Sequence, residues 1–125
     1  MWNPFKSPSK RDTGNYFEKQ ACRYLKQQGL VFEDKNINFS VGEIDLLMRD
    51  KEQLVFVEVR FRHSNQFGGS VASVDKIKQS KLIKAAQLYL QQNYKNQQPI
   101  CRFDVIAFQG SKDKFKTQWI KNAFY

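Results

Sequence analysis

The chain has 125 residues, of which 41% are hydrophobic, so it is long enough for one domain with a buried core and too short for several. The 21 Lys and Arg residues against 12 Asp and Glu leave a formal charge of +9, which points to a polyanionic partner, nucleic acid first, unless the charge only serves solubility. Cys22 and Cys101 form no CxxC pair, and no stretch reaches the roughly twenty apolar residues that cross a bilayer, which argues against a zinc knuckle, a disulfide framework and a membrane partner. We therefore expect a cytoplasmic protein.

The first element is a helix behind a short arm. Residues 1–13 are basic and interrupted by proline, and we expect them to form a flexible arm. Gly14 or Asn15 then opens a helix that Gly29 closes, with Glu18 near the edge of its packing face. The apolar residues of that face recur at intervals of three and four: Phe17, Ala21, Tyr24 and Leu25.

Three strands follow the helix. From Leu30 to Phe61 the apolar period changes to two, with turn signals at residues 41–42 and 50–52, which predicts three consecutive antiparallel strands. Glu58 and Arg60 share one face of the third strand because side chains alternate along it. In the second strand we expect strict alternation, and Asp45 then meets Glu58 if the hairpin register aligns them. The two faces predicted for that strand are Glu43, Asp45 and Leu47 on one side and Ile44, Leu46 and Met48 on the other.

The remaining elements complete one domain over residues 14–125. A loop containing Gly68-Gly69 spans residues 63–73, and a long helix follows from about Val74 to Tyr94. Ile100 to Phe108 is predicted as a strand, and a last strand or edge segment follows Gly110. The predicted order is α-β-β-β-α-β with a short β addition.

The charged residues inside apolar strands suggest a site. Two carboxylates on adjacent strands, Asp45 and Glu58, are suitable ligands for Mg²⁺ or Mn²⁺, which prefer oxygen and commonly use one or two carboxylates. Arg60 could stabilise charge on a phosphate beside them. The alternative is an ordinary ion pair in which Arg60 and Arg62 neutralise a carboxylate at a solvated sheet edge.

The chain contains the segments Gly42-Glu43-Ile44-Asp45-Leu46-Leu47, Val55-Phe56-Val57-Glu58-Val59-Arg60-Phe61-Arg62, Phe67-Gly68, Ser73-Val74, Lys78, Lys81-Leu82 and Arg102-Phe103-Asp104-Val105. In these segments it resembles the YraN-type family of small bacterial proteins, which is similar to Holliday junction resolvases and, more distantly, to PD-(D/E)xK nucleases. The resemblance implies an α/β fold with a restriction-endonuclease-like core, a mixed central sheet flanked by helices. The oligomeric state stays open, and a homodimer is the state to check because resolvase-like enzymes that act on two strands often work as dimers. The resemblance covers about residues 14–124.

The same resemblance assigns roles to three acidic residues. Asp45 matches the nuclease aspartate, Glu58 the acidic member of the (D/E)xK pair, and Glu18 the acidic residue of the first helix, so together they would hold the divalent metal. Glu43 is a weaker candidate for supporting a ligand, and an exposed position at the start of its strand is the other interpretation. Asp104 is a second weaker candidate, and a residue hydrogen-bonded inside the fold is its other interpretation.

One position departs from the nuclease pattern, because Arg60 stands where the lysine is expected. Arginine stays charged, so Arg60 can stabilise a phosphate but is a poor base. Lys78 is the residue that we expect to reach in from the second helix in place of that lysine. A basic rim for nucleic acid, DNA first, is expected around the site, and its residues are Arg60, Arg62, His63, Lys76, Lys78 and Lys81.

The sequence thus leaves three functional hypotheses. The first is a divalent-metal-dependent endonuclease acting on structured DNA. The second is a catalytically inactive module that recruits DNA or RNA to a partner, for which the basic rim matters and the carboxylates do not. The third is a protein-interaction factor in which the acidic cluster is structural.

Overall fold

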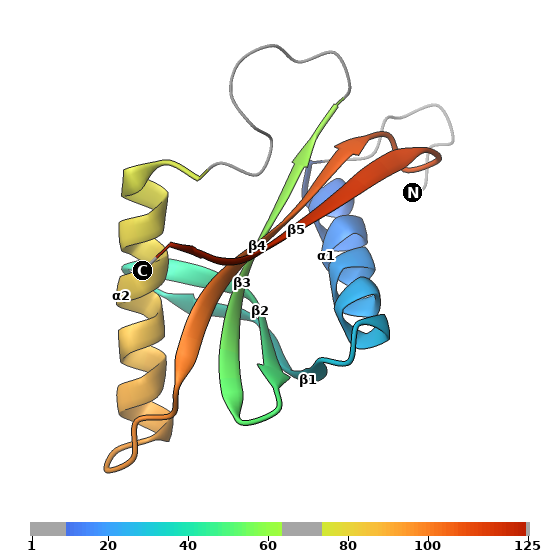
Figure 1. Ribbon diagram of the computed structural model, residues 1–125. Coiled ribbons are helices and arrows are strands. Elements are labelled where there is room, and N and C mark those ends of the chain that lie inside the picture. The colour runs from blue at the N-terminus through green and yellow to red at the C-terminus, as the bar shows by residue number, and fades with distance from the viewer. Residues whose placement is uncertain (1–9, 64–73, 125) are drawn as a thin grey trace, which may run out of the picture.

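The protein is a five-stranded mixed sheet between two helices (Figure 1). The computed structural model describes residues 10–63 and 74–124, so most of the predicted arm and the Gly68-Gly69 loop lie outside the described residues. Strands lie in the order β1-β2-β3-β4-β5, with β3 and β4 parallel and the other neighbours antiparallel. The elements are α1 (Lys10–Gln27), β1 (Val31–Phe39), β2 (Gly42–Asp50), β3 (Gln53–Arg62), α2 (Lys76–Asn93), β4 (Cys101–Gly110) and β5 (Phe115–Phe124).

Helix α1 is longer than predicted. It begins at Lys10, so Gly14 lies inside the helix and does not open it. Asp12 in the first turn interacts favourably with the positive end of the helix dipole, which offsets part of the modest cost of an interior glycine. The predicted end is confirmed, because Gly29 adopts a φ of 99° that suits glycine, and Leu30 N donates to Leu25 O at 3.0 Å.

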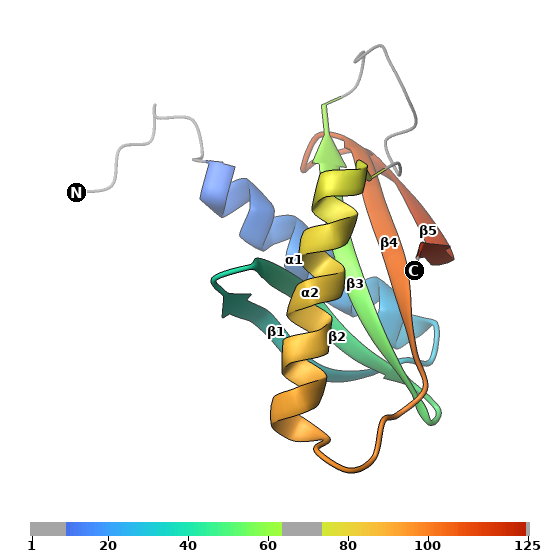
Figure 2. The ribbon, with the colours of Figure 1, turned by 90° about the vertical axis from the view of Figure 1, so that its left-hand side faces the viewer.

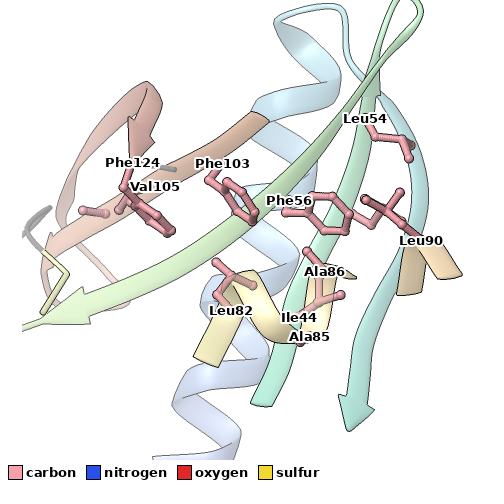
Figure 3. Close-up of a cluster of buried hydrophobic side chains, with 12 residues drawn as sticks. Ile44, Leu54, Phe56, Leu82, Ala85, Ala86, Leu90, Phe103, Val105 and Phe124 are labelled. Carbon is pink, nitrogen blue, oxygen red and sulfur yellow. The ribbon is translucent and has the colours of Figure 1, made fainter. Parts of the chain in front are cut away.

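The two helices cover opposite faces of the sheet, as the two ribbon views show (Figures 1 and 2). Strand β3 alternates as predicted, with Val55 and Val57 packed among residues of α1 and with Leu54 and Phe56 packed among residues of α2. Figure 3 shows the cluster on the α2 side, where Phe56 lies between strands and helix. Each face of the sheet therefore has its own apolar core.

Helix α2 is held close to the start of β2. Asp75 caps its N-terminus, since Oδ1 accepts a hydrogen bond from Lys78 N at 2.8 Å. A Cβ atom at Gly42 would lie 2.5 Å from the carbonyl oxygen of Lys81, so only glycine allows this approach. The first two turns of α2 are thereby fixed beside β2 and β3.

Strands β4 and β5 form the edge of the sheet on the side away from Asp45 and are joined by partly buried hydrogen bonds. β5 is a full ten-residue edge strand rather than a short addition. Asp104 is fully buried and accepts hydrogen bonds from Arg102 Nε at 3.0 Å, Trp119 Nε1 at 3.0 Å and Asn122 N at 2.9 Å. The interpretation of Asp104 as a residue hydrogen-bonded inside the fold is confirmed.

Candidate functional site

The regular pleat of β1 and β2 breaks where Asn36 faces Asp45. The paired residues on either side are Lys35 with Leu46 and Ile37 with Ile44. Asn36 has a φ of 52°, a left-handed conformation that asparagine tolerates better than most residues. This local rotation coincides with a change of face in the partner strand.

The prediction of strict alternation in β2 is therefore wrong at this point. Ile44 packs in the α2 core together with Leu47, whereas Leu46 packs in the α1 core. In a regular strand Ile44 and Leu46 would lie on one face. The break places Asp45 between the two faces instead of on one of them.

Asp45 also stands where β2 and β3 diverge. The ladder between these strands runs from Asp50 and Gln53 to Leu46 and Val57, and one further step in the same register would pair Asp45 with Glu58. At that step Asp45 Oδ2 instead accepts a hydrogen bond from the backbone N–H of Val59 at 3.0 Å. The observed register up to Leu46 and Val57 is the one that the expected meeting of Asp45 and Glu58 requires, and at the next step the carboxylate takes the place of a backbone acceptor.

Glu58 is the buried carboxylate of the pair, with 2% of the residue exposed. Lys78 Nζ lies 2.7 Å from Glu58 Oε1, a short ion-pair contact, yet Oε1 accepts no well-aligned hydrogen bond within the described part of the chain. Among the described ion pairs the partner of Glu58 is thus Lys78 on α2 and not Arg60. Glu58 is thus in an ion pair, as the alternative interpretation proposed, but its partner is Lys78, whereas Arg60 and Arg62 were expected.

The carboxylates share an excess of negative potential. Burial, and then the nearby charge of Glu58, raise the pKa of Asp45 to about 8, although the hydrogen bond from Val59 opposes this. Burial and then Glu43 raise the pKa of Glu18, against the opposing charge of Lys35. Both shifts mean that these acids resist ionisation without a compensating cation.

The pKa of Lys78 is also raised, which for a lysine favours the charged form. Burial on its own would lower the pKa of its ammonium group, but the contact with Glu58 and the charge of Asp45 outweigh it, so the pKa is raised. Arg60 acts against this rise, which places its charge within range of Lys78. Lys78 is therefore a stable cation at neutral pH.

A pocket of about 500 Å³ opens beside Asp45, and Glu58 is not among the residues that line it. Lys78 lines it from α2, and Glu18 lines it from α1. None of the other predicted rim residues lines it in the described part of the chain; Lys76, Lys81 and His63 are exposed, while Arg60 and Arg62 are partly buried. The remaining lining residues are Gly14, Asn15, Phe17, Asn36, Asn38, Glu43, Asp45, Val59 and Phe61.

The residues that could hold a hard divalent cation are the two carboxylates Asp45 and Glu58, whereas three, with Glu18, were expected from the sequence. Across residues 10–63 and 74–124, no three His, Cys, Asp or Glu side chains converge closely enough to form a ready-made metal centre. Asp45 and Glu58 nevertheless provide carboxylate oxygens, of which Glu58 Oε1 is already in contact with Lys78 Nζ at 2.7 Å. One or two carboxylates are what Mg²⁺ commonly uses while it keeps several waters.

Asn36 is the site residue that sequence reasoning missed. It lines the pocket and provides the backbone break that faces Asp45. The available signal was an asparagine within a strand, since asparagine is depleted in strands and enriched in left-handed conformations. That signal predicts an irregularity but not which carboxylate lies opposite.

A mixed sheet between two helices, with carboxylates where its strands diverge, defines an α/β protein whose fold is consistent with a nuclease-like core. The chain belongs to the family described as "Uncharacterised protein family UPF0102", whose model matches residues 17–108, and the YraN-type resemblance is thereby confirmed.

Relatives match nearly the whole chain. A UPF0102 protein from Yersinia enterocolitica is 49% identical over 93% of this chain and 97% of its own length. Those from Nitrosococcus oceani and Alcanivorax borkumensis are 42% and 45% identical, over 95% and 94% of this chain and 96% and 94% of their own lengths. Neither described helix is long and apolar enough to cross a membrane.

Proposed function

We propose that this protein is a divalent-metal-dependent phosphodiesterase that acts on nucleic acid, and on DNA first. The observation that carries the proposal is the pair formed by Asp45 and Glu58 at the divergence of β2 and β3, beside an open pocket. A net charge of +9 supports a polyanionic substrate. Glu18 and Glu43 surround the pair and add to its negative potential.

The residues of the chain have distinct tasks in this proposal. Mg²⁺ or Mn²⁺ at Asp45 and Glu58 would supply Lewis acidity toward a phosphate oxygen and a water molecule. The N–H of Val59 donates to Oδ2 of Asp45 and so restrains this carboxylate, whose other oxygen, Oδ1, would be available to the cation. Since the pKa of Asp45 is about 8 without a cation, this carboxyl group must lose a proton as the cation binds.

Lys78 takes the position of the lysine that Arg60 replaces. Its ammonium group contacts Glu58 and lines the pocket, so it can donate a hydrogen bond to a phosphate oxygen there. The raised pKa keeps Lys78 protonated, so it would stabilise negative charge on the phosphate and would not act as a base. Arg60 is likewise a cation and a poor base.

Cleavage assays with branched, flapped and single-stranded DNA in millimolar Mn²⁺ test the proposal. We expect Asp45→Asn and Glu58→Gln to lower the rate by roughly 100-fold or more, the scale of removing one group that stabilises developing charge. The exposed Asp113→Asn variant is the matched control and should cleave normally. No cleavage by the wild type, or equal cleavage by Asp45→Asn, would rule out the chemistry.

A module that binds nucleic acid without turnover is the second candidate. The observation that favours it is Arg60 in place of the lysine, together with the absence of a three-ligand metal cluster among the described residues. It predicts salt-sensitive binding that survives both Asp45→Asn and Glu58→Gln, with no cleavage in either metal.

A further inference from the structure

A second cavity adjoins the carboxylate pocket along the outer side of α1. Its volume is about 670 Å³, and it lies between α1 and the β1–β2 hairpin. Asn15, Glu18 and Asn36 line both cavities, so the two lie side by side. We call this second cavity the α1 groove.

The α1 groove is basic, in contrast to the pocket beside it. Lys19, Arg23 and Lys26 follow one another at intervals of four and three, so they lie on one side of α1 over about 10 Å of its length. Lys35 joins them from β1. All four are exposed, and none forms an ion pair with a carboxylate of the described residues.

An aromatic ring lies among these cations. Phe32 is 38% exposed and lines the groove, with Lys26 Nζ 5.7 Å from its ring centroid. Exposed aromatic rings beside cations are how proteins hold unpaired bases, because each base can stack on a ring while cations contact the phosphates. A base-paired duplex cannot present its stacked bases to such a ring.

The charge changes sign from the α1 groove, which is lined by cations, to the pocket, which is lined by carboxylates. The charge of Lys35 acts on Glu18, the carboxylate at the boundary, so cations meet acids within interaction range. A polyanion lying in the groove would therefore lead one phosphate toward Asp45 while its neighbours remain among cations.

We propose that the α1 groove binds a single, unpaired strand of nucleic acid, with Lys19, Arg23, Lys26 and Lys35 on its phosphates and Phe32 against a base. This inference rests on the proposed function, since it identifies the strand that the carboxylate pocket would receive. A groove of about 670 Å³ has the volume of a pocket for a drug-sized ligand, so it takes a few nucleotides of one strand and not a double helix.

Binding measured in EDTA tests the groove without any cleavage. Fluorescence anisotropy would compare labelled single-stranded DNA, the same sequence as RNA, and the DNA duplex. We expect both single strands to bind more tightly than the duplex, and the variant with Lys19→Gln, Arg23→Gln and Lys26→Gln to weaken single-strand binding about tenfold or more. Its salt slope should fall by about two, as expected for three lost phosphate contacts.

The control variant carries Lys84→Gln, Lys95→Gln and Lys116→Gln, which removes three exposed cations elsewhere. It should change the affinity less than about twofold. An equal loss in both triple variants would show an effect of net charge alone, and tighter binding of the duplex would show that the groove does not select a single strand. Either result overturns the proposal.

Phe32→Ala separates stacking from charge. It should weaken single-strand binding roughly fivefold or more, the lower end for one stacked base. Binding of polyphosphate, a polyanion without bases, should not change. Equal losses for both ligands, or no loss for either, would contradict the assigned role of Phe32.

A cysteine in the groove reports the position of the strand. Cys22 lines the α1 groove, and Cys101 is the chain's other cysteine. In a Cys101→Ser variant, single-stranded DNA should slow maleimide labelling of Cys22. In a Cys22→Ser variant it should leave the labelling of Cys101 unchanged, and equal protection of both thiols would place the strand elsewhere.

These outcomes remain distinct from those of the cleavage assay. Loss of cleavage in Asp45→Asn with unchanged binding in EDTA supports both proposals. Cleavage that depends on Asp45 while the groove variants bind normally overturns the groove alone. Strand binding that depends on the groove without any cleavage overturns the nuclease alone.

Discussion

Lys78 on α2 and Glu58 on β3 form an ion pair between two layers of the fold, with Nζ 2.7 Å from Oε1. The carboxylate side chain is 3% exposed and the ammonium side chain is 53% exposed. The pair therefore joins a buried charge, which needs a partner, to a cation that can still reach the pocket.

Removing Lys78 should destabilise the protein because Glu58 is left without compensation. We expect Lys78→Met to lower the free energy of unfolding by about 1–3 kcal/mol, and Glu58→Gln to recover much of that loss in the double variant. Urea unfolding of the four proteins gives the coupling energy. The exposed pair of Arg49 and Glu33 is the control, with an expected coupling of about 0.2–1 kcal/mol; a smaller coupling for Lys78 and Glu58 would contradict the assigned pairing.

The raised pKa of Asp45 makes stability depend on pH. In the unfolded chain its pKa is near 3.8, and in the fold it is about 8, so the folded state holds the extra proton between these values. This contribution to stability is complete below about pH 4 and is lost progressively as the pH rises to about 8.

Asp45→Asn should therefore raise the free energy of unfolding at pH 8 by at least about 1.4 kcal/mol more than at pH 5, the equivalent of one pKa unit. Asparagine keeps an oxygen that can accept from Val59 N. Urea unfolding at both pH values measures the difference, with Asp113→Asn as an exposed control. A gain that is equal at pH 5 and pH 8 would show that Asp45 does not titrate in this range.

Divalent cations should stabilise the wild type and do so more strongly at higher pH. Mn²⁺ at ten times its Kd adds about 1.4 kcal/mol, which corresponds to a rise in Tm of several degrees. The rise should increase from pH 6 to pH 8, because Asp45 must release its proton to bind the cation. Thermal unfolding with and without Mn²⁺ measures it.

The rise in Tm with Mn²⁺ should depend on the carboxylates of Asp45 and Glu58. Asp45→Asn combined with Glu58→Gln should abolish the Mn²⁺-dependent change in Tm, whereas Glu52→Gln, at an exposed turn, should preserve it. A full rise in the double variant would mean that the cation binds elsewhere.

Asn36 should tolerate glycine but not a β-branched residue. Its φ of 52° costs about 1–2 kcal/mol for most side chains, so Asn36→Val should destabilise the protein by about that amount while Asn36→Gly changes little. Asn38→Val, at a nearby exposed strand position, is the control and should cost less than 1 kcal/mol. Similar losses at both positions would indicate a general cost of valine in β1.

Much of the fold was predictable because its signals are local. The end of α1 at Gly29, the alternation of β3 and the hairpin register that opposes Asp45 and Glu58 all follow from periodicity and turn residues. The start of α1 was predicted too late, because Gly14 is a weak helix breaker whose cost the rest of the helix absorbs. The length of β5 depended on its pairing with β4, which short-range patterns do not encode.

By itself, the sequence determined the order of the elements and which carboxylates lie on neighbouring strands, since a period of two and two short turns define both. Only the tertiary structure decided that Lys78 pairs with Glu58, that Asn36 breaks the pleat opposite Asp45, and that the cations of α1 line one groove with Phe32. The reason is physical: each of these depends on how separate layers pack together, and the cost of burying a charge selects its partner only once those layers are in contact.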